Sequence, residues 1–409
     1  MTTDAKPQAT ATTRKGPLSR FTILDATRVR AGPTAVRTFA DLGARIIKLE
    51  IPPGAPGGDD LIGGRDHNRP DYENLHRNKE SLTLNMKEPE GHEILHALVR
   101  QADVFIENYR PDVKHRLGIG PDVLRKINPR LVYASISGFG QDGPAAKWPG
   151  FDSIAQGMGG VMSVTGKPGE GPMRAGIPIA DLCAGHFCCQ AIMAALLERD
   201  ATGEGQWVQT SLLEAQIAML DFQAATWLID HKVPQSTGNE HPLTVPTGVF
   251  ETQDGYINIA AIGQTIFRRL CEAIGAPHLP DEPGFGSDPE RVKNREKVNA
   301  AITQQLKAGT TAHWTETLLK AGVPCGPIYQ IDEVFQDPQV KHLGMALPMQ
   351  HPDLGPIEVV GLPMQFSRHP RAQGPMTAAP QQGAHTDAIL HDLGYSPERI
   401  AQLRARFVV

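Results

Sequence analysis

The chain has 409 residues, of which 40 % are hydrophobic and 21 % are charged, and its formal net charge is −5 at pH 7. This length allows about two or three domains, and the hydrophobic share is sufficient for a sizeable core. The acidic balance argues against a protein that binds nucleic acid or an anionic membrane, because such a protein needs a surplus of basic residues.

The cysteines and the N-terminal segment indicate a compartment. Five cysteines are an odd and sparse set, which favours free thiols in a reducing, cytoplasmic environment over a disulfide framework. No stretch reaches the roughly 18 uninterrupted apolar residues of a membrane span. Residues 1–18 are small, polar and slightly basic, without the apolar core of a secretory signal. We expect a disordered lead-in there, with a transit peptide as the alternative.

The N-terminal half alternates between apolar runs and helical patterns. Strands are predicted at 21–26, 44–50, 81–86, 103–109 and 131–137. Helices are predicted between them, and the first has Pro33 near its start and Gly43 just past its end, an asymmetry typical of helices. Alternation of strand and helix implies a parallel sheet with helices on both faces. The predicted fold class is therefore α/β.

The character of the sequence changes in the second half. Long helices are predicted at about 181–199 and 212–230, around a strand at 206–212. Residues 249–261 have a hairpin pattern with Asp254-Gly255 at the turn, and helical patterns follow. We interpret 230–335 as a second, smaller α+β domain.

Several common site motifs are absent from the sequence. There is no G-x-G-x-x-G after a strand, no G-x-x-x-x-G-K-[ST] and no G-x-S-x-G, so dinucleotide oxidoreduction, P-loop phosphoryl transfer and serine hydrolysis lose their usual support. Cys183, His186, Cys188 and Cys189 cluster in sequence, but a helix would spread them around its circumference. We predict small core residues there and no metal site.

Two features could carry chemistry. Residues 109–130 hold six Lys or Arg against two Asp; charge alone favours a solvated face, and the alternative is a site for a polyanion such as a nucleotide cofactor. Asp181 follows extended residues and precedes an apolar helix, and the sequence alone favours an N-cap role for it. Arg174 could pair with a substrate carboxylate, although an exposed arginine is the commoner outcome.

From about residue 20 onward, ordered segments carry a family resemblance. They include ILDATRVRAGPTAVRTFADLGARIIKLE (23–50), ADVFIENYRPD (102–112), GFDSIAQGMGGVMSVTG (150–166), IPIADLCAG (177–185) and GVPCGPIYQIDEVFQDPQV (322–340). Together these segments resemble the family III CoA-transferases, which include formyl-CoA transferase and carnitine CoA-transferase. The α-methylacyl-CoA racemases belong to the same superfamily. The last segment, with HPDLGPIEVVGLPMQFS (351–367), is most similar to the succinyl-CoA:glutarate type.

The resemblance implies an architecture. It predicts a Rossmann-like large domain built from both chain ends, a smaller α+β domain between them, and two chains interlocked as a homodimer. The domain limits that follow are a lead-in at 1–18, the large domain at 19–229 and 336–409, and the small domain at 230–335.

The resemblance also implies site residues. The family's catalytic aspartate falls on Asp181, and the acidic residue beside its active site falls on Asp152. Coenzyme A (CoA) would be contacted by Arg30, Ala31, Leu84, Asn85, Met86, Lys87, Asn108, Tyr109, Arg116 and Phe151. CoA or acyl-CoA would be a substrate, with no tightly bound cofactor and no metal. The position of Arg116 favours a nucleotide site in the basic stretch.

The sequence departs from relatives in three places. Ile51 stands where formyl-CoA transferase has an arginine. The glycine-rich loop of formyl-CoA transferase is not recognisable near 238–248 of this chain, which disfavours formate or oxalate as the acid. Phe151 stands where the racemases have a histidine, so one of the two opposed groups that racemisation needs is missing. The resemblance therefore favours CoA transfer through aspartyl-anhydride and aspartyl-CoA intermediates to a carboxylic acid, and the C4–C6 dicarboxylates are candidates. The alternatives are a racemase and a non-catalytic CoA-binding protein.

Overall fold

The computed structural model describes residues 15–55, 68–370 and 376–409, so most of the predicted lead-in lies outside the described residues. The chain divides into two compact units. Unit 1 contains Met1–Val161, Ala175–Ile229 and Lys341–Val409, and unit 2 contains Met162–Arg174 and Asp230–Val340. The predicted domain limits remain a prediction. The units differ from them mainly because residues 162–174 group with unit 2.

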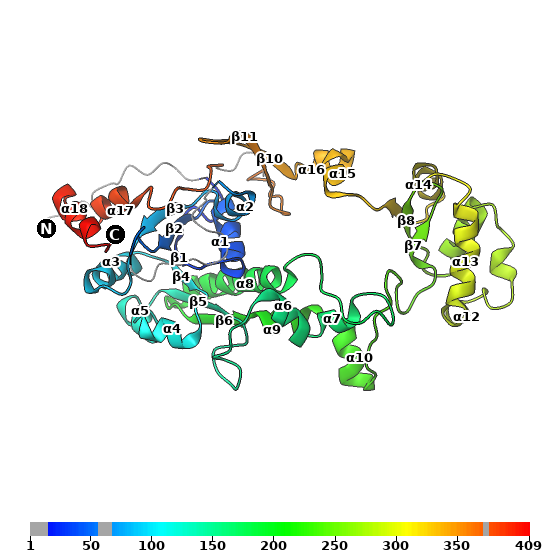
Figure 1. The fold of residues 1–409 in the computed structure, drawn as a ribbon, viewed down its shortest axis with the longest axis horizontal. Helices are drawn as coiled ribbons and strands as arrows, with labels where there is room; N and C mark the ends of the chain where they lie inside the picture. The colour runs from blue at the N-terminus through cyan, green and yellow to red at the C-terminus, as the bar shows by residue number, and fades with distance from the viewer. Residues whose placement is uncertain (1–14, 56–67, 371–375) are drawn as a thin grey trace. The chain divides into compact units, whose positions relative to one another are not determined.

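Unit 1 is built on a parallel sheet of six strands in the order β3-β2-β1-β4-β5-β6 (Figure 1). Its strands are β1 (Thr22–Ala26), β2 (Arg45–Glu50), β3 (Glu80–Thr83), β4 (Val104–Glu107), β5 (Val132–Ser137) and β6 (Trp207–Ser211). Each overlaps a strand predicted from the sequence. The α/β prediction is therefore confirmed. The strand order reverses between β1 and β4, which lie side by side although two strands separate them in sequence.

Both faces of this sheet are covered by helices, because alternate strand residues point to opposite sides and both sides are apolar. Ile23 belongs to the core cluster shared with α1 (Ala31–Asp41) and α8 (Ile179–Thr202). Leu24 belongs to the cluster shared with α3 (Pro89–Val99), α5 (Pro121–Ile127), α17 (Thr386–Asp392) and α18 (Pro397–Ala405). Figure 1 shows α17 and α18 beside α3.

The remaining elements of unit 1 are short. They are α2 (Pro70–His76), α4 (Pro111–Arg116), α6 (Asp152–Met158), α9 (Leu212–Met219), α10 (Phe222–Asp230), and the hairpin strands β10 (Ala346–His351) and β11 (Gly355–Val360). The helix α7 (Val161–Val164) and the helix α16 (Pro338–Leu343) lie where the chain passes between the two units. Ser396 caps α18 as the Ser-Pro pair predicts, because its hydroxyl accepts a hydrogen bond from the Arg399 N–H.

Segments far apart in sequence meet in unit 1. The buried Arg77 side chain binds Asp41 and donates to the Val360 carbonyl at 2.8 Å. The Asn78 side chain accepts a hydrogen bond from the Thr377 N–H at 2.8 Å. The Asn85 N–H donates to the Val408 carbonyl at 2.8 Å. Residues 341–409 therefore complete a structure that begins with β1.

Unit 2 has an antiparallel sheet in the order β7-β8-β9, formed by β7 (Thr247–Glu251), β8 (Tyr256–Ala260) and β9 (Cys325–Pro327). The predicted hairpin is confirmed, and the Asp254 carboxylate at its turn accepts a hydrogen bond from the Thr311 N–H at 2.8 Å. Its helices are α11 (Gln264–Ala273), α12 (Asp288–Lys293), α13 (Arg295–Leu306), α14 (Thr311–Lys320) and α15 (Ile331–Gln336), with a 3₁₀ turn at Leu279–Asp281.

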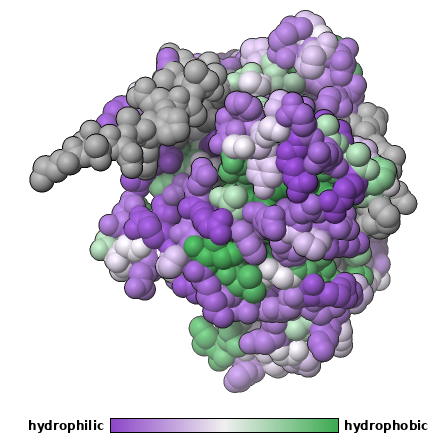
Figure 2. All heavy atoms as spheres, turned by 90° about the vertical axis from the view of Figure 1, so that its left-hand side faces the viewer, coloured by the Kyte–Doolittle hydropathy of each residue, from purple (hydrophilic) through white to green (hydrophobic). Residues whose placement is uncertain are grey.

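Among the described residues, only α8 has the length and mean hydropathy of a membrane span. One face of α8 packs on α1 and the sheet within the core of unit 1, and the central helix of an α/β unit has the same apolar composition. Figure 2 views the molecule from the side of α17 and α18, where the surface is mostly hydrophilic with small hydrophobic areas.

Candidate functional site

A cavity in unit 1 has a volume of about 470 Å³ and lies at the carboxyl ends of the parallel strands. All six strands contribute a segment that follows or ends them. These segments are Arg28–Ala31 after β1, Ile51 after β2, Asn85–Lys87 after β3, Asn108–Arg110 after β4, Ile136–Gly138 at the end of β5 and Leu212 after β6. A cavity beside a reversal of strand order is the usual ligand site of open α/β sheets.

The structure gathers most of the predicted site residues around this cavity. Those that line it are Arg30, Ala31, Asn85, Met86, Lys87, Asn108, Tyr109, Arg116, Phe151 and Asp181. Leu84 differs from the others. Its side chain is buried in the core beside α3, because it points to the opposite side from Asn85. Asp152 is also outside the cavity lining. Its carboxylate instead accepts a hydrogen bond from the Ala180 N–H at the start of α8.

Other lining residues were not predicted, and the strand ends could have indicated them. They are Arg28, Val29, Ile51, Arg110, Val113, Leu117, Ile136, Ser137, Gly138, Pro149, Gly150 and Leu212. Ligands in such sheets bind beyond the carboxyl ends of strands; the predicted ends of β1 and β5 agree with the structure, and that of β4 lies two residues beyond Glu107. The positions of Arg28 and Arg110 follow from that rule.

Asp181 lies in the first turn of α8, but the helix cap is supplied by Asp152. The Asp152 Oδ1 atom accepts hydrogen bonds from the Ala180 N–H at 2.8 Å and the Asp181 N–H at 3.3 Å. The N-cap role that the sequence favoured for Asp181 is therefore wrong. Because a carboxylate from α6 satisfies the free N–H groups of the helix start, the Asp181 side chain is left available to the cavity.

Asp152 is in turn held by Gln156, a fully buried residue one helical turn further along α6. The Gln156 amide donates to Asp152 Oδ2 at 2.7 Å and to the Ile177 carbonyl at 3.3 Å. Its oxygen accepts a hydrogen bond from the Ala175 N–H at 2.9 Å. Gln156 thus fixes both Asp152 and the segment that leads into α8.

The electrostatic setting of Asp181 favours its neutral form. Burial of the carboxyl, reinforced by the negative charge of Asp152, raises the pKa of Asp181 to about 6, and Arg30 opposes the shift. These two effects outweigh the helix dipole, which by itself would favour the anion in the first turn of α8. A buried carboxyl with a pKa near neutrality inside a cavity is a typical property of a reactive group.

A glycine brings α8 close to the start of α1. A Cβ atom on Gly185 would lie 2.5 Å from the Ala31 carbonyl oxygen, so any other residue would push the two helices apart. Gly185 is one turn after Asp181, and Ala31 follows Arg30. The close approach therefore explains why the Asp181 carboxyl and the Arg30 guanidinium influence each other.

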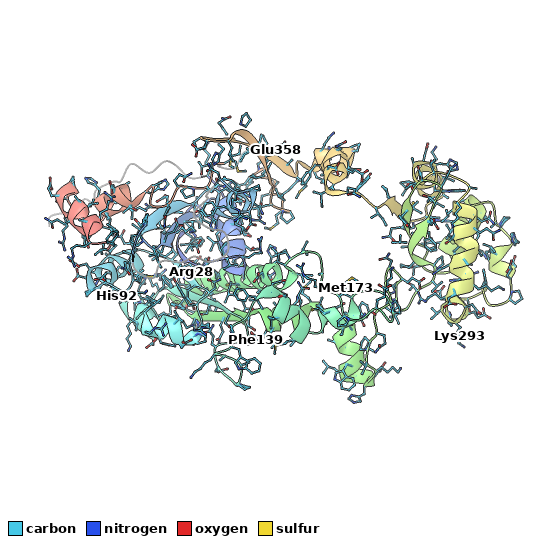
Figure 3. All side chains as sticks on the ribbon, viewed as in Figure 1. Arg28, His92, Phe139, Met173, Lys293 and Glu358 are labelled. Carbon is cyan, nitrogen blue, oxygen red and sulfur yellow. The ribbon has the colours of Figure 1, made fainter. Side chains whose placement is uncertain are left out.

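The segments after β1 and β4 are clamped together by Asn108. Its side-chain oxygen accepts a hydrogen bond from the Arg28 N–H and its amide donates to the Arg28 carbonyl, both at 2.8 Å. The Arg28 guanidinium lies 4.8 Å from the centre of the Tyr109 ring and donates to its hydroxyl. Figure 3 labels Arg28 in this clamp and Phe139 in the segment between β5 and α6. Asn108 thus shapes the cavity.

The predicted basic stretch at 109–130 divides into four groups, one of which is the exposed Lys126 of α5. Arg110 and Arg116 are exposed and line the cavity, in agreement with a site for an anion. Lys114 is fully buried against Glu107 and is neither solvated nor part of the cavity surface. Arg125 and Arg130 donate to the carbonyls of the 203–205 turn.

Among the residues that the structure describes, five cations line the cavity against a single carboxylate. They are Arg28, Arg30, Lys87, Arg110 and Arg116, and the carboxylate is Asp181. Arg30 also pairs with Asp71 at 2.8 Å, and Arg110 lies 3.8 Å from Asp112. Such an excess of positive charge attracts a polyanion even though the whole chain is acidic. Among the described residues, no group of three or more His, Cys, Asp or Glu side chains is placed to hold a metal.

Comparisons with known proteins agree with this geometry. The model of CoA-transferase family III matches residues 18–386. The chain belongs to this family. It is 35 % identical to a succinyl-CoA:glutarate CoA-transferase of Homo sapiens over 96 % of the chain and 90 % of that protein. It is 39 % identical to an acetyl-CoA:oxalate CoA-transferase of Acetobacter aceti over 85 % of the chain and 87 % of that protein.

A solved structure supports the same conclusion. A CAIB/BAIF family protein from Brucella suis superposes with a TM-score of 0.80 and is 33 % identical, covering 92 % of this chain and 99 % of that one. The predicted family and the predicted enzyme class, a CoA-transferase, are thereby confirmed. Membership implies an acyl-CoA substrate, which fits a cationic cavity at the sheet's carboxyl edge.

Proposed function

We propose that the protein moves CoA from an acyl-CoA donor to a dicarboxylic acid, with Asp181 as the group that becomes acylated. The single observation that carries this proposal is the cavity in which, over the described part of the chain, Asp181 is the one lining carboxylate beside five cations. The cations would hold the phosphates of CoA, and the carboxylate would face the thioester.

The chemical steps follow from the carboxylate. Asp181 attacks the thioester carbonyl of the donor, the C–S bond breaks, and an aspartyl-acyl anhydride and CoA thiolate result. The thiolate attacks the Asp181 carbonyl, which releases the donor acid and leaves an aspartyl-CoA thioester. The acceptor carboxylate attacks this thioester to give a second anhydride, and the thiolate then takes the new acyl group and restores Asp181.

Asp152 gives these steps a physical advantage. In the free enzyme the burial of Asp181 and its proximity to Asp152 disfavour the Asp181 anion, which is why the pKa is raised. In the anhydride and in the thioester Asp181 carries no charge, so both penalties disappear. The site therefore destabilises the attacking carboxylate relative to the covalent intermediates, which raises its reactivity.

The choice of acid rests on relatives. Those matched here are named for glutarate and for oxalate, both dicarboxylates. The departures from formyl-CoA transferase disfavoured oxalate as the acid, but one relative is named as an acetyl-CoA:oxalate CoA-transferase. That relative supports keeping oxalate among the candidate acids. Arg174, the residue considered for a substrate carboxylate, is exposed in unit 2.

We also propose an interlocked homodimer and a cytoplasmic location.

Trapping would test the covalent route. After addition of succinyl-CoA, hydroxylamine should convert Asp181 to a hydroxamate that mass spectrometry finds on its peptide. An Asp181→Ala variant should give no adduct and no transfer, whereas Asp392→Ala, an exposed aspartate of α17, should behave as the unchanged chain does. Transfer by Asp181→Ala would refute the assignment. Deuterium exchange at the substrate α-carbon without an acceptor acid would instead indicate a racemase.

A further inference from the structure

A buried ion pair lies beside the cavity, between Glu107 at the end of β4 and Lys114 in α4. Both side chains are fully buried, and the Lys114 Nζ atom lies 3.1 Å from the Glu107 Oε1 atom. The ammonium also donates to the Ser135 hydroxyl at 3.0 Å and to the Gln141 oxygen. A buried ion pair contributes little net stability, so its presence calls for another explanation.

Each partner of this pair holds a different wall of the cavity. Glu107 Oε2 accepts a hydrogen bond from the Tyr109 N–H at 2.8 Å, which fixes the segment after β4. Lys114 belongs to α4, whose Val113 and Arg116 line the cavity. Gln141 belongs to the segment between β5 and α6, whose last residues also line it.

The pair is enclosed on its remaining sides. The Lys114 Nζ atom lies 5.0 Å from the centre of the Trp207 ring and 5.8 Å from that of Tyr133. The Trp207 Nε1–H group donates to the Ser135 hydroxyl at 3.0 Å. With three acceptors for three N–H bonds and aromatic rings around them, the ammonium has one defined position.

We propose that Lys114 is a positioning residue for CoA: its ammonium joins three walls of the cavity and so fixes the separation of the groups that bind the nucleotide. The inference rests on the proposed function, because it takes CoA to be the occupant. Lys114 itself is outside the lining and touches no substrate. Its loss should weaken CoA binding and leave the chemistry at Asp181 unchanged.

Two variants, Glu107→Gln with Lys114→Met and Gln141→Leu, separate this role from general stability. The single change Lys114→Met is unsuitable, because it leaves the Glu107 carboxylate buried without a partner and is strongly destabilising. The double variant Glu107→Gln with Lys114→Met removes both charges while an amide oxygen still faces the Tyr109 N–H. Gln141→Leu breaks one link and keeps the ion pair. Lys126→Met, the same substitution at an exposed lysine of α5, is the matched control.

The experiment is calorimetric titration of each full-length variant with CoA alone, followed by steady-state kinetics. The double variant should bind CoA about tenfold more weakly, and Gln141→Leu about threefold, with kcat at saturating acyl-CoA within about twofold. Lys126→Met should match the unchanged chain. Equal CoA affinity in the folded double variant, or a loss confined to kcat, would overturn the inference.

The remaining outcomes are also decisive. If the double variant does not unfold cooperatively, Gln141→Leu decides alone: unaltered CoA binding overturns the inference, and weaker binding supports it. If the unchanged chain does not bind CoA, the proposed function fails and the inference fails with it. If the unchanged chain binds CoA and the variants bind it equally well, only the inference fails.

Discussion

The Asp181 carboxyl and the cations Lys87, Arg110 and Arg116 line the same cavity, and they are held to very different degrees. Around Asp181, a buried glutamine fixes an aspartate, and that aspartate fixes the start of a helix. By contrast, the side chains of the three cations are exposed to solvent. The difference fits two tasks, because bond formation needs a fixed atom, whereas attraction of a polyanion needs charge and tolerates movement.

The largest effect should come from the fixed group. Asp181→Asn should lower turnover by at least about a thousandfold, because an amide does not attack a thioester. The same variant should be more stable at pH 7.5, by at most about 3 kcal/mol, because it removes a carboxylate whose pKa is raised by burial. Thermal unfolding and a transfer assay measure both.

The size of that stability gain depends on pH. The folded chain binds a proton at Asp181 more tightly than the unfolded chain does, since its pKa is about 6 in place of the ordinary 3.8. The ionised Asp181 carboxylate therefore destabilises the unchanged chain fully above pH 6, and this destabilisation disappears as the pH falls below 3.8. A gain in stability that is equal at pH 4 and pH 7.5 would contradict a buried, charged Asp181.

The support behind Asp181 should come second. Gln156→Leu keeps the volume but removes the hydrogen bonds to Asp152, Ala175 and Ile177. We expect kcat to fall by about tenfold and the free energy of unfolding by about 1–3 kcal/mol, because buried polar partners are left unsatisfied. Gln305→Leu, in helix α13 of unit 2, is a comparison variant. An unchanged kcat in Gln156→Leu would show that the support is unnecessary.

The exposed cations should give smaller, separable effects. Arg110→Ala and Arg116→Ala should each raise the KM for acyl-CoA by about three- to tenfold without a change in kcat. The loss should shrink as ionic strength rises, because salt screens exposed charges. Lys126→Ala should leave KM unaltered. An effect on kcat alone would mean that these arginines act in the chemistry, and the contrast between the two groups would be lost.

The smallest effect should be a displacement of the pH profile. The rate should fall as the pH drops through about 6, because protonated Asp181 is not a nucleophile. Asp152→Asn removes a negative charge that raises this pKa, so the acid limb should move to lower pH by less than about one unit. A rate profile measured from pH 4.5 to 8 would detect it. A displacement to higher pH would contradict the assigned cause.

Much of the fold follows from local sequence pattern. Every strand of the parallel sheet is recognisable in the sequence, and the central strands β1, β4 and β5 are so because buried strands form short apolar runs between turn residues. The site was accessible only in part. The family resemblance led to Asp181, but the role of Asp152 as its helix cap depends on α6 and α8 meeting in space. No spacing along the chain reveals that contact.

Two residues lie in surroundings that the local sequence does not reveal. Leu84 is predicted as a CoA contact with its neighbours, and its side chain enters the core because side chains alternate along an extended segment. Lys114 was grouped with the basic stretch, where charge alone favours solvent. Its burial depends on Glu107, Ser135 and Gln141, which tertiary structure brings together.

The hydrogen bond from Asn85 to Val408 has a consequence for biosynthesis. Asn85 begins one wall of the cavity, and its partner is translated 323 residues later. At about 5–20 residues per second, ribosomes need roughly 15–65 s to cover that interval. During this time α3 and the strands beside it lack α17 and α18, and the apolar surface that these helices cover is exposed. We expect the nascent chain to need protection from aggregation until its last segment emerges.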